Sequence, residues 1–225
     1  MANPPQGALM YLLHSYPDTA GTVVRLVLAE LGLSHEVRMI DRPGGELATS
    51  RYRAKNPLGL IPALDTPDGV MFETGAMLLY LSDRHPGLAP HPDAPERAGF
   101  LSWFFMINNG IHPTLLQLYY PERVAGAEHV PAVLSHARSR VLAQLALVEA
   151  MLAKDAPVWL SASQPLLGYY LGILLRWLAD AGPSFVSQDF PALHRALSQL
   201  ETRPAVRLVA MAESLGPRPF TQPRA

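Results

Sequence analysis

Short apolar runs alternate with segments of helical period in the first third of the chain. Short apolar runs bounded by polar residues or proline favour buried strands, and apolar positions that recur every three or four residues favour helices. These patterns predict, in chain order, a strand at 9–13, a helix at 23–31, a strand at 35–40, a helix at 46–55, a hairpin joining 63–64 to 70–72, and a helix at 73–84. The order βαβαββα predicts an α/β domain of the thioredoxin-like type with a mixed sheet.

Beyond this region the pattern changes. Four prolines between residues 86 and 95 mark a stiff linker. The long segments that follow have helical period, with apolar sets that begin at Phe100, Val141 and Leu193. The predicted organisation is a thioredoxin-like domain at 1–86, a proline-rich linker at 87–95 and an all-α domain at 96–225.

Composition narrows the possible functions. The chain has 225 residues, of which 49% are hydrophobic and 16% are charged, so it can bury a sizeable core. Its formal net charge of −1 gives no electrostatic attraction to nucleic acid or to an anionic membrane. The sequence contains no cysteine, which excludes disulfides, a protein thiolate nucleophile and zinc–thiolate sites, and no His-Glu-x-x-His motif indicates a metal site.

Targeting and membrane signals are also missing. The first residues do not form a positively charged start followed by an apolar core, as a secretion signal would. The most apolar run, Leu166–Leu175, is shorter than the ~20 residues that cross a bilayer. We therefore expect a cytoplasmic protein without a membrane span.

The most informative motif is Asn-Pro-Leu-Gly-Leu-Ile-Pro-Ala-Leu at 56–64, followed within ten residues by Phe-Glu-Thr. Proline lacks a backbone N–H, so Pro62 at the start of a strand belongs at an edge, a bulge or a cis turn. A trans bond that merely ends a loop is the alternative. A cis bond would leave the N–H and C=O of Ile61 free to pair with an extended peptide. Glu73 and Thr74, at a predicted helix start, would then hold the charged end of that peptide.

This motif resembles that of the glutathione transferase family, whose members carry Asn-Pro-x-Gly-x-[Ile/Val]-Pro-Ala-Leu, then Glu-[Ser/Thr], then a helix. The similar stretch runs from Asn56 to Thr74. Phe190–Leu193 and Arg203–Val206 resemble a late helix of the family and the helix after it, and the opening strand, turn and helix also fit. The resemblance covers nearly the whole chain. It implies the glutathione transferase fold, an α/β thioredoxin-like N-terminal domain followed by an all-α C-terminal domain.

The resemblance also implies that glutathione binds as a co-substrate, with no metal or redox cofactor. The backbone at Ile61 and Pro62 would pair with the cysteinyl part of glutathione. Thr74 would take the γ-glutamyl carboxylate, and Glu73 the neighbouring ammonium. Glu73 and Thr74 are equally suited to capping a helix without any ligand, and the two roles are compatible.

Family chemistry requires a hydrogen-bond donor in the turn after the first strand, because a thiol with a pKa near 8.5 is mostly protonated at neutral pH. Bacterial beta-like members usually hold a Cys at the position of Ala20, which has no side-chain donor. We expect Thr19 or Thr22 to donate instead, assisted by the backbone N–H of Ala20 or Gly21, with Ser15 as a weaker candidate. The alternative is that these residues only cap the helix that follows.

His112 lies nine residues after Trp103, a spacing of Trp and His that the beta-like class shares and that implies a His near the glutathione sulfur. A cationic or hydrogen-bond-donating imidazole would stabilise a thiolate. The alternative is that a His before Pro113 serves only a local carbonyl. Asn109 and Met106 are expected to face the same way as His112.

Two further sets of residues complete the expected site. Arg53 and Lys55 would meet the glycyl carboxylate of glutathione, unless they are simply solvated surface cations. The second substrate is expected to be a small hydrophobic electrophile. Side chains that suit its pocket, although each also suits the core or a dimer surface, are Trp103, Met106, Tyr119, Tyr120 and Phe220.

The leading interpretation is a glutathione transferase that activates the thiol for attack on a hydrophobic electrophile, in a detoxification role. The alternative is a non-catalytic or regulatory glutathione-binding module of the same fold. Ala20 favours this alternative, as does Leu60, where many relatives have a polar or basic residue. A glutathione-dependent isomerase or reductase is a third option, but the run of serines and cysteine typical of the isomerases is missing. Family members are usually homodimers, so a homodimer is also implied.

Overall fold

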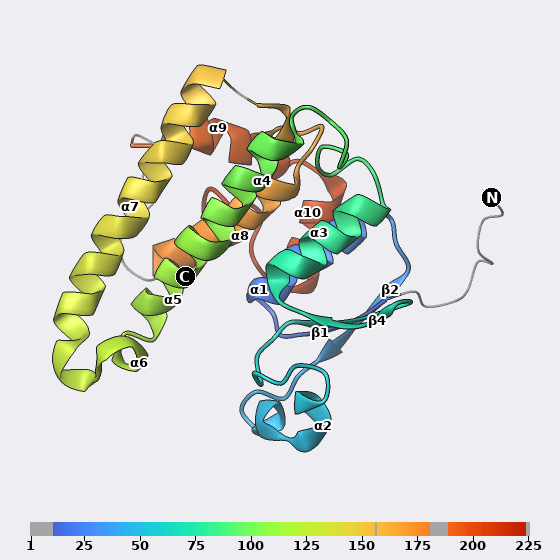
Figure 1. Cartoon of the computed structure of the whole chain (residues 1–225), viewed down its shortest axis with the longest axis vertical. Helices are drawn as coiled ribbons and strands as arrows, with labels where there is room; N and C mark the ends of the chain where they lie inside the picture. The colour runs from blue at the N-terminus through green and yellow to red at the C-terminus, as the bar shows by residue number, and fades with distance from the viewer. Residues whose placement is uncertain (1–10, 156, 181–188, 224–225) are drawn as a thin grey trace. The chain divides into compact units, whose positions relative to one another are not determined.

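The computed structural model describes residues 11–155, 157–180 and 189–223 (Figure 1). The chain divides into two compact units. The first comprises the residues up to His85 together with Arg203–Leu215, and the second comprises Pro86–Thr202 and the residues from Gly216 onward. Residues 203–215 therefore differ from the predicted organisation, in which 96–225 formed one all-α domain.

The first unit is built on a four-stranded mixed sheet. Its strands are β1 (Tyr11–Ser15), β2 (His35–Met39), β3 (Ala63–Thr66) and β4 (Gly69–Phe72). β1 is parallel to β2 and antiparallel to β3, and β3 is antiparallel to β4, which gives the order β2-β1-β3-β4. The predicted mixed sheet of a thioredoxin-like domain is confirmed.

Three helices of the first unit pack on this sheet or on one another (Figure 1). They are α1 (Ala20–Glu30), α3 (Thr74–Arg84) and α10 (Pro204–Ala212). α1 contacts β1, α3 and α10. Its apolar face is completely buried, as are the residues of β1 and β3 that point toward the same core, among them Val24, Val27, Leu13 and Leu64.

Two predicted boundaries shift for local reasons. α1 starts at Ala20 rather than at Val23, because Thr19 and Thr22 form a capping box in which each hydroxyl accepts a backbone N–H from the other end of the first turn. β1 is described from Tyr11 onward, and Leu9 and Met10, predicted to open this strand, lie outside the described residues.

The helix predicted at 46–55 is interrupted. A short 3₁₀ turn, η1 (Glu46–Ala48), precedes a single helical turn, α2 (Ser50–Arg53). Thr49 separates the two, because its extended backbone ends η1 while its hydroxyl accepts the N–H of Tyr52 and caps α2.

The described part of the second unit is helical. Its elements are α4 (Arg97–Met106), the π-helical turn η2 (Ile107–Ile111), α5 (His112–Tyr119), α6 (Glu122–Ala125), the 3₁₀ turn η3 (Ala127–His129), α7 (Val130–Asp155), the 3₁₀ turn η4 (Val158–Leu160), α8 (Leu166–Asp180) and α9 (Pro191–Leu200). α7 runs beside α5 and α9, and α8 packs against α9 (Figure 1). The apolar positions predicted to face a core at Phe100, Val141 and Leu193 are fully buried.

One stretch of the second unit departs from the regular period. The apolar set that begins at Phe100 has helical period, but the chain widens into a π-helical turn at η2 before α5 begins. Pro113 lies in the first turn of α5, directly after this π-helical turn. Within the described ranges, none of the helices combines the length and the apolarity that a bilayer-spanning segment needs.

Candidate functional site

The pairing of the strands brings three segments of the first unit to one end of the sheet. Ala63 of β3 lies opposite His14 of β1 and also opposite Phe72 of β4. The residues just beyond His14, Ala63 and Phe72 at this end of the sheet are Ser15, Pro62 and Glu73.

The Ile61–Pro62 peptide bond is cis, as predicted. Pro62 is buried and Ile61 is half-buried, just before β3 begins. Within the described parts of the chain, the backbone N–H and C=O of Ile61 make no hydrogen bond to another residue. An extended peptide laid beside Ile61 would therefore find one donor and one acceptor.

Two side chains whose roles the sequence did not reveal hold the loop that leads to Ile61. The Tyr52 hydroxyl donates to the carbonyl of Leu60 at 2.8 Å, and the Asn56 side-chain amide donates to the same oxygen at 2.7 Å. Burial raises the pKa of Tyr52 to about 12, so it stays a protonated donor at neutral pH. Gly59 has a φ of 65°, and a Cβ placed there would lie 2.9 Å from the carbonyl oxygen of Leu47. The Asn and Gly of the motif thus shape the loop.

Glu73 and Thr74 stand where α3 begins, as predicted. Glu73 has φ 71° and ψ 114°, a backbone conformation that residues with a Cβ rarely adopt, and its side chain does not cap the helix. Thr74 is 7% exposed. Neither the Glu73 carboxylate nor the Thr74 hydroxyl forms a hydrogen bond or ion pair with any described residue. Backbone strain beside unpaired polar groups is typical of ligand-binding positions.

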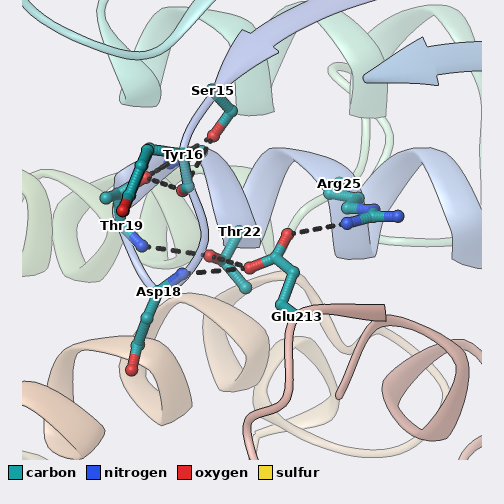
Figure 2. Close-up of polar contacts among 8 residues, drawn as sticks. Ser15, Tyr16, Asp18, Thr19, Thr22, Arg25 and Glu213 are labelled. Carbon is teal, nitrogen blue, oxygen red and sulfur yellow. Dashed lines mark hydrogen bonds and ion pairs between the residues drawn. The ribbon is translucent and has the colours of Figure 1, made fainter. Parts of the chain in front are cut away.

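The turn after β1 is held by hydrogen bonds that involve both threonines (Figure 2). The Thr22 hydroxyl donates to Oε2 of Glu213 at 2.7 Å and accepts the N–H of Thr19 at 3.1 Å, and its side chain is completely buried. A completely buried hydroxyl that both donates and accepts inside the fold is not accessible to a bound thiol. This finding corrects the prediction that Thr22 is a candidate donor, and Glu213 is a residue that sequence reasoning missed.

Thr19 is more accessible than Thr22. Its half-buried hydroxyl donates to the carbonyl of Tyr16 at 2.6 Å and caps α1 by accepting the N–H of Gly21.

Ser15 is 2% exposed, and a Cβ at Gly21 would lie 1.8 Å from its Oγ, so only glycine fits there. The N–H of Ala20, at the positive end of α1, has no partner among the described residues.

Lys55 belongs to a polar cluster rather than to the surface. Its Nζ lies 2.8 Å from both carboxylate oxygens of Asp65, and Oδ2 of Asp65 also lies 3.0 Å from Nε2 of His14. This contact corrects the prediction of a Lys55 cation free to meet a carboxylate. Arg53 is exposed and makes no ion pair with a described residue.

The cluster also explains the charge state of His14. Burial lowers the pKa of His14, and the hydrogen bond to Asp65 offsets this only in part, so the imidazole is neutral at neutral pH. Burial raises the pKa of the Asp65 carboxyl, but the hydrogen bonds from Lys55 and His14 outweigh it and leave the pKa below its ordinary value. Of the two side chains hydrogen-bonded to Asp65 in the described chain, Lys55 therefore carries the balancing positive charge.

His112 is neutral as well. Burial lowers its pKa to about 4. The Tyr170 hydroxyl donates to Oδ1 of Asn108 at 2.9 Å, so it accepts from Nδ1 of His112, at 2.7 Å. The proton of the neutral ring therefore sits on Nδ1, which leaves Nε2 as an acceptor. The expectation of a cationic imidazole, or of one with a proton to donate to a thiolate, is wrong for this reason.

The other predicted residues of the second unit occupy varied environments. Trp103 is half-buried, with its ring centre 6.5 Å from that of Trp159, and Met106 is half-buried at the end of α4. Asn109 is exposed in η2 and accepts a hydrogen bond from Asn108 at 2.8 Å. The roles proposed for these side chains at a substrate site stay predictions.

Phe220 is a core residue. It is 1% exposed, and a Cβ built on Gly172 of α8 would lie 2.6 Å from its ring. The expectation that it lines an open pocket is wrong, because its ring fills the space left by the missing side chain of Gly172. In the parts of the chain that the structure describes, no three His, Asp or Glu side chains lie close enough together to hold a metal ion.

Comparisons with known proteins agree with the fold of the chain. Residues 13–90 match the family model for the N-terminal domain of glutathione S-transferases. The chain is 30% identical over 150 residues to glutathione S-transferase 3 of Zea mays, which covers 64% of this chain and 67% of the relative. It is 26% identical over 199 residues to the stringent starvation protein A homolog of Pasteurella multocida, which covers 87% of each.

Among solved structures, the chain is similar to the glutathione transferase URE2P8 from Phanerochaete chrysosporium, crystallised with oxidized glutathione. The TM-score is 0.81 with 21% sequence identity, and the match covers 93% of this chain and 97% of that one. This likeness extends the agreement in fold to nearly the whole chain.

Proposed function

Because this chain belongs to the glutathione transferase family, we propose that it binds glutathione at the sheet end formed by Ile61, Glu73 and Thr74 and activates the thiol for attack on a hydrophobic electrophile. The observation that carries the proposal is the set of unpaired groups at this end. The backbone of Ile61 and the side chains of Glu73 and Thr74 have no partner among the described residues.

Each of these groups suits one part of the tripeptide. The N–H and C=O of Ile61 pair with the main chain of the cysteinyl residue, as in strand addition. The hydroxyl and N–H of Thr74, at the positive end of α3, take the γ-glutamyl carboxylate, and the carboxylate of Glu73 takes the ammonium. Arg53, which is exposed and makes no ion pair within the described chain, is the remaining candidate for the glycyl carboxylate.

Thiol activation is assigned to the start of α1. Lowering a thiol pKa from 8.5 to about 6.5 takes roughly 2.7 kcal/mol in favour of the thiolate. The N–H of Ala20 and the Thr19 hydroxyl, once it turns from the carbonyl of Tyr16, supply hydrogen bonds at the positive end of the helix. The thiol proton leaves to solvent. The thiolate then attacks the electrophilic carbon of the second substrate and forms the C–S bond, while bound glutathione is held in place for the attack. In a substitution the leaving group departs with its bonding electron pair, and in an addition the displaced π electrons take up a proton from solvent.

A second candidate is a glutathione-binding module without turnover. Two observations favour it: the proton of the Thr19 hydroxyl is donated to the carbonyl of Tyr16, and one relative is a stringent starvation protein A homolog rather than a named transferase. The two candidates differ in what happens to the thiol after glutathione binds.

Calorimetric titration with glutathione, followed by thiolate absorbance of the complex against pH, separates them. Binding with a thiol pKa well below its free value supports the transferase. Binding with an unshifted thiol pKa supports the module. If glutathione fails to bind at all, both candidates are wrong.

The substitution Thr74→Val tests the binding site. Val keeps the shape of the side chain but removes the hydroxyl that meets the γ-glutamyl carboxylate. The loss of one hydrogen bond to a charged group, worth about 1.5–3 kcal/mol, is expected to raise the Kd for glutathione about ten- to hundredfold. Calorimetry measures the Kd.

The matched control is Thr66→Val, in the same unit but at the hairpin between β3 and β4, where the hydroxyl donates to the carbonyl of Gly69 at 2.8 Å. Thr66→Val is expected to leave the Kd unchanged. Equal Kd values for the wild type and Thr74→Val would remove Thr74 from the proposed site.

A further inference from the structure

The returning helix α10 is tied to α1 at both of its ends. Arg203, just before α10, forms an ion pair with Glu30, the last residue of α1. Glu213, just after α10, reaches the first turns of α1, where it contacts Thr22 and Arg25. The two helices therefore run antiparallel, and the second tie lies beside the turn that carries Thr19.

The Glu213 carboxylate is buried, and both of its oxygens are hydrogen-bonded (Figure 2). Oε2 accepts the hydroxyl of Thr22 at 2.7 Å and the backbone N–H of Asp18 at 3.1 Å, and Oε1 accepts from the guanidinium of Arg25 at 3.1 Å. The side chain of Glu213 is only 3% exposed. A buried carboxylate with these partners fixes their positions, because leaving any donor unpaired there is costly.

These contacts converge on the turn proposed to activate the thiol. Asp18, whose N–H Glu213 holds directly, has a φ of 54°, in the left-handed region. Thr19 donates its N–H to the Thr22 hydroxyl, whose own proton goes to Glu213. Two successive backbone amides are thus anchored to one carboxylate, the first directly and the second through Thr22.

We propose that Glu213 is a positioning residue, which holds the turn 18–20 so that the Thr19 hydroxyl and the Ala20 N–H meet the thiol of glutathione. This assignment rests on the proposed function. Glu213 acts through Thr22 and the turn and does not itself touch the substrate. Arg25 balances its charge, so the carboxylate supplies geometry without adding an unpaired negative charge that would oppose the thiolate.

Amide hydrogen exchange in the free protein tests the anchoring without any ligand. Glu213→Gln is close in shape, but its amide has one acceptor oxygen and an N–H₂ group that cannot accept from Arg25 or from the turn. The amides of Asp18 and Thr19 are expected to exchange about tenfold faster in Glu213→Gln than in the wild type. Unchanged exchange at both amides would overturn the proposal.

Glu30→Gln is the matched control. It weakens the tie between α1 and α10 at the opposite end, where Glu30 meets Arg203, and it leaves the turn untouched. The exchange of Asp18 and Thr19 in Glu30→Gln is expected to stay within about twofold of the wild type. Faster exchange in both variants alike would mean that any loosening of α10 is sufficient, and it would overturn a specific role for Glu213.

Turnover measured with glutathione and 1-chloro-2,4-dinitrobenzene then tests the positioning role. For Glu213→Gln we expect kcat near pH 6.5 to fall about tenfold or more, with a raised pKa of the bound thiol. The KM for glutathione is expected to change less than about threefold, because the groups assigned to the peptide lie before β3, at the start of α3 and in α2, outside the turn 18–20. General destabilisation would not lower kcat and raise the thiol pKa while leaving the KM for glutathione nearly unchanged. The control Glu30→Gln is expected to keep the wild-type kcat.

Two variants of Thr22 complete the test. Thr22→Val removes the hydroxyl and is expected to match Glu213→Gln, and the double variant is expected to be no worse than either single one, because both remove the same connection. Thr22→Ser keeps the hydroxyl and is expected to retain kcat. Additive losses, or a wild-type kcat and thiol pKa in Glu213→Gln, would overturn the positioning role alone. A wild type that does not bind glutathione would overturn the proposed function and this role with it.

Discussion

Replacing Phe220 with alanine is expected to lower the free energy of unfolding by about 3–5 kcal/mol, the usual cost of emptying a fully buried phenylalanine site. The ring is 1% exposed and packs onto Gly172 and onto the ring of Tyr169, whose centre lies 6.5 Å away. Gly172 has no side chain that could fill the cavity. Urea unfolding followed by circular dichroism measures the loss.

Phe105→Ala in the same unit is the matched control. Phe105 is 46% exposed, so its removal is expected to cost less than about 1 kcal/mol. A substrate-lining role for Phe220 predicts the opposite pattern, with an unchanged free energy of unfolding and an altered KM for the electrophile. Similar costs for the two substitutions would show that Phe220 is not part of the core.

Acid is expected to destabilise the protein through His112. Its pKa is lowered by burial from the ordinary 6.5 to about 4, so between these values the unfolded chain binds a proton that the folded protein does not. The corresponding stabilisation is complete above pH 6.5 and is lost as the pH falls toward 4. At about 1.4 kcal/mol per pKa unit, the loss amounts to about 3 kcal/mol.

His112→Asn isolates this contribution, since the asparagine amide can still donate to the Tyr170 hydroxyl from the position of Nδ1 but does not titrate. Urea unfolding at several pH values between 7.5 and 4.5 is expected to show a shallower loss in the variant than in the wild type. Parallel pH profiles, or an NMR titration that places the His112 pKa at or above 6.5, would contradict a neutral buried imidazole.

Much of the proposed binding site could be predicted because its chemistry is local. The hairpin, the place of Pro62 at the start of a strand and the helix start at Glu73 and Thr74 follow from residues a few positions apart, whereas the choice of a cis over a trans bond before Pro62 also rests on the resemblance to the family. Proline restricts its own backbone, glycine permits the turn at Gly59, and a polar pair marks the start of α3. Such backbone preferences depend on residues a few positions apart, so they can be predicted from a single sequence.

The errors about polar site residues share one cause, which is that packing decides the partner of a polar side chain. Thr22 donates to Glu213, 191 positions away, and Lys55 binds Asp65 on a neighbouring strand, although both looked free in the sequence. The sequence gives no reason to expect an altered pKa for His112. In the folded protein α8 places Tyr170 against its ring and burial lowers its pKa.

The helix α10 shows the same division. The resemblance of Arg203–Val206 to a helix of the family predicted a helix near the end of the chain, just as the Asn-Pro-x-Gly and Glu-Thr pattern indicated the family and the sheet end proposed to bind glutathione. The apolar face of an amphipathic helix, however, can be buried against any apolar core, so it does not determine which unit the helix joins. The three-dimensional packing assigned this helix to the first unit and set Glu213 beside the turn, because burial and hydrogen-bond pairing depend on which surfaces meet after the chain folds.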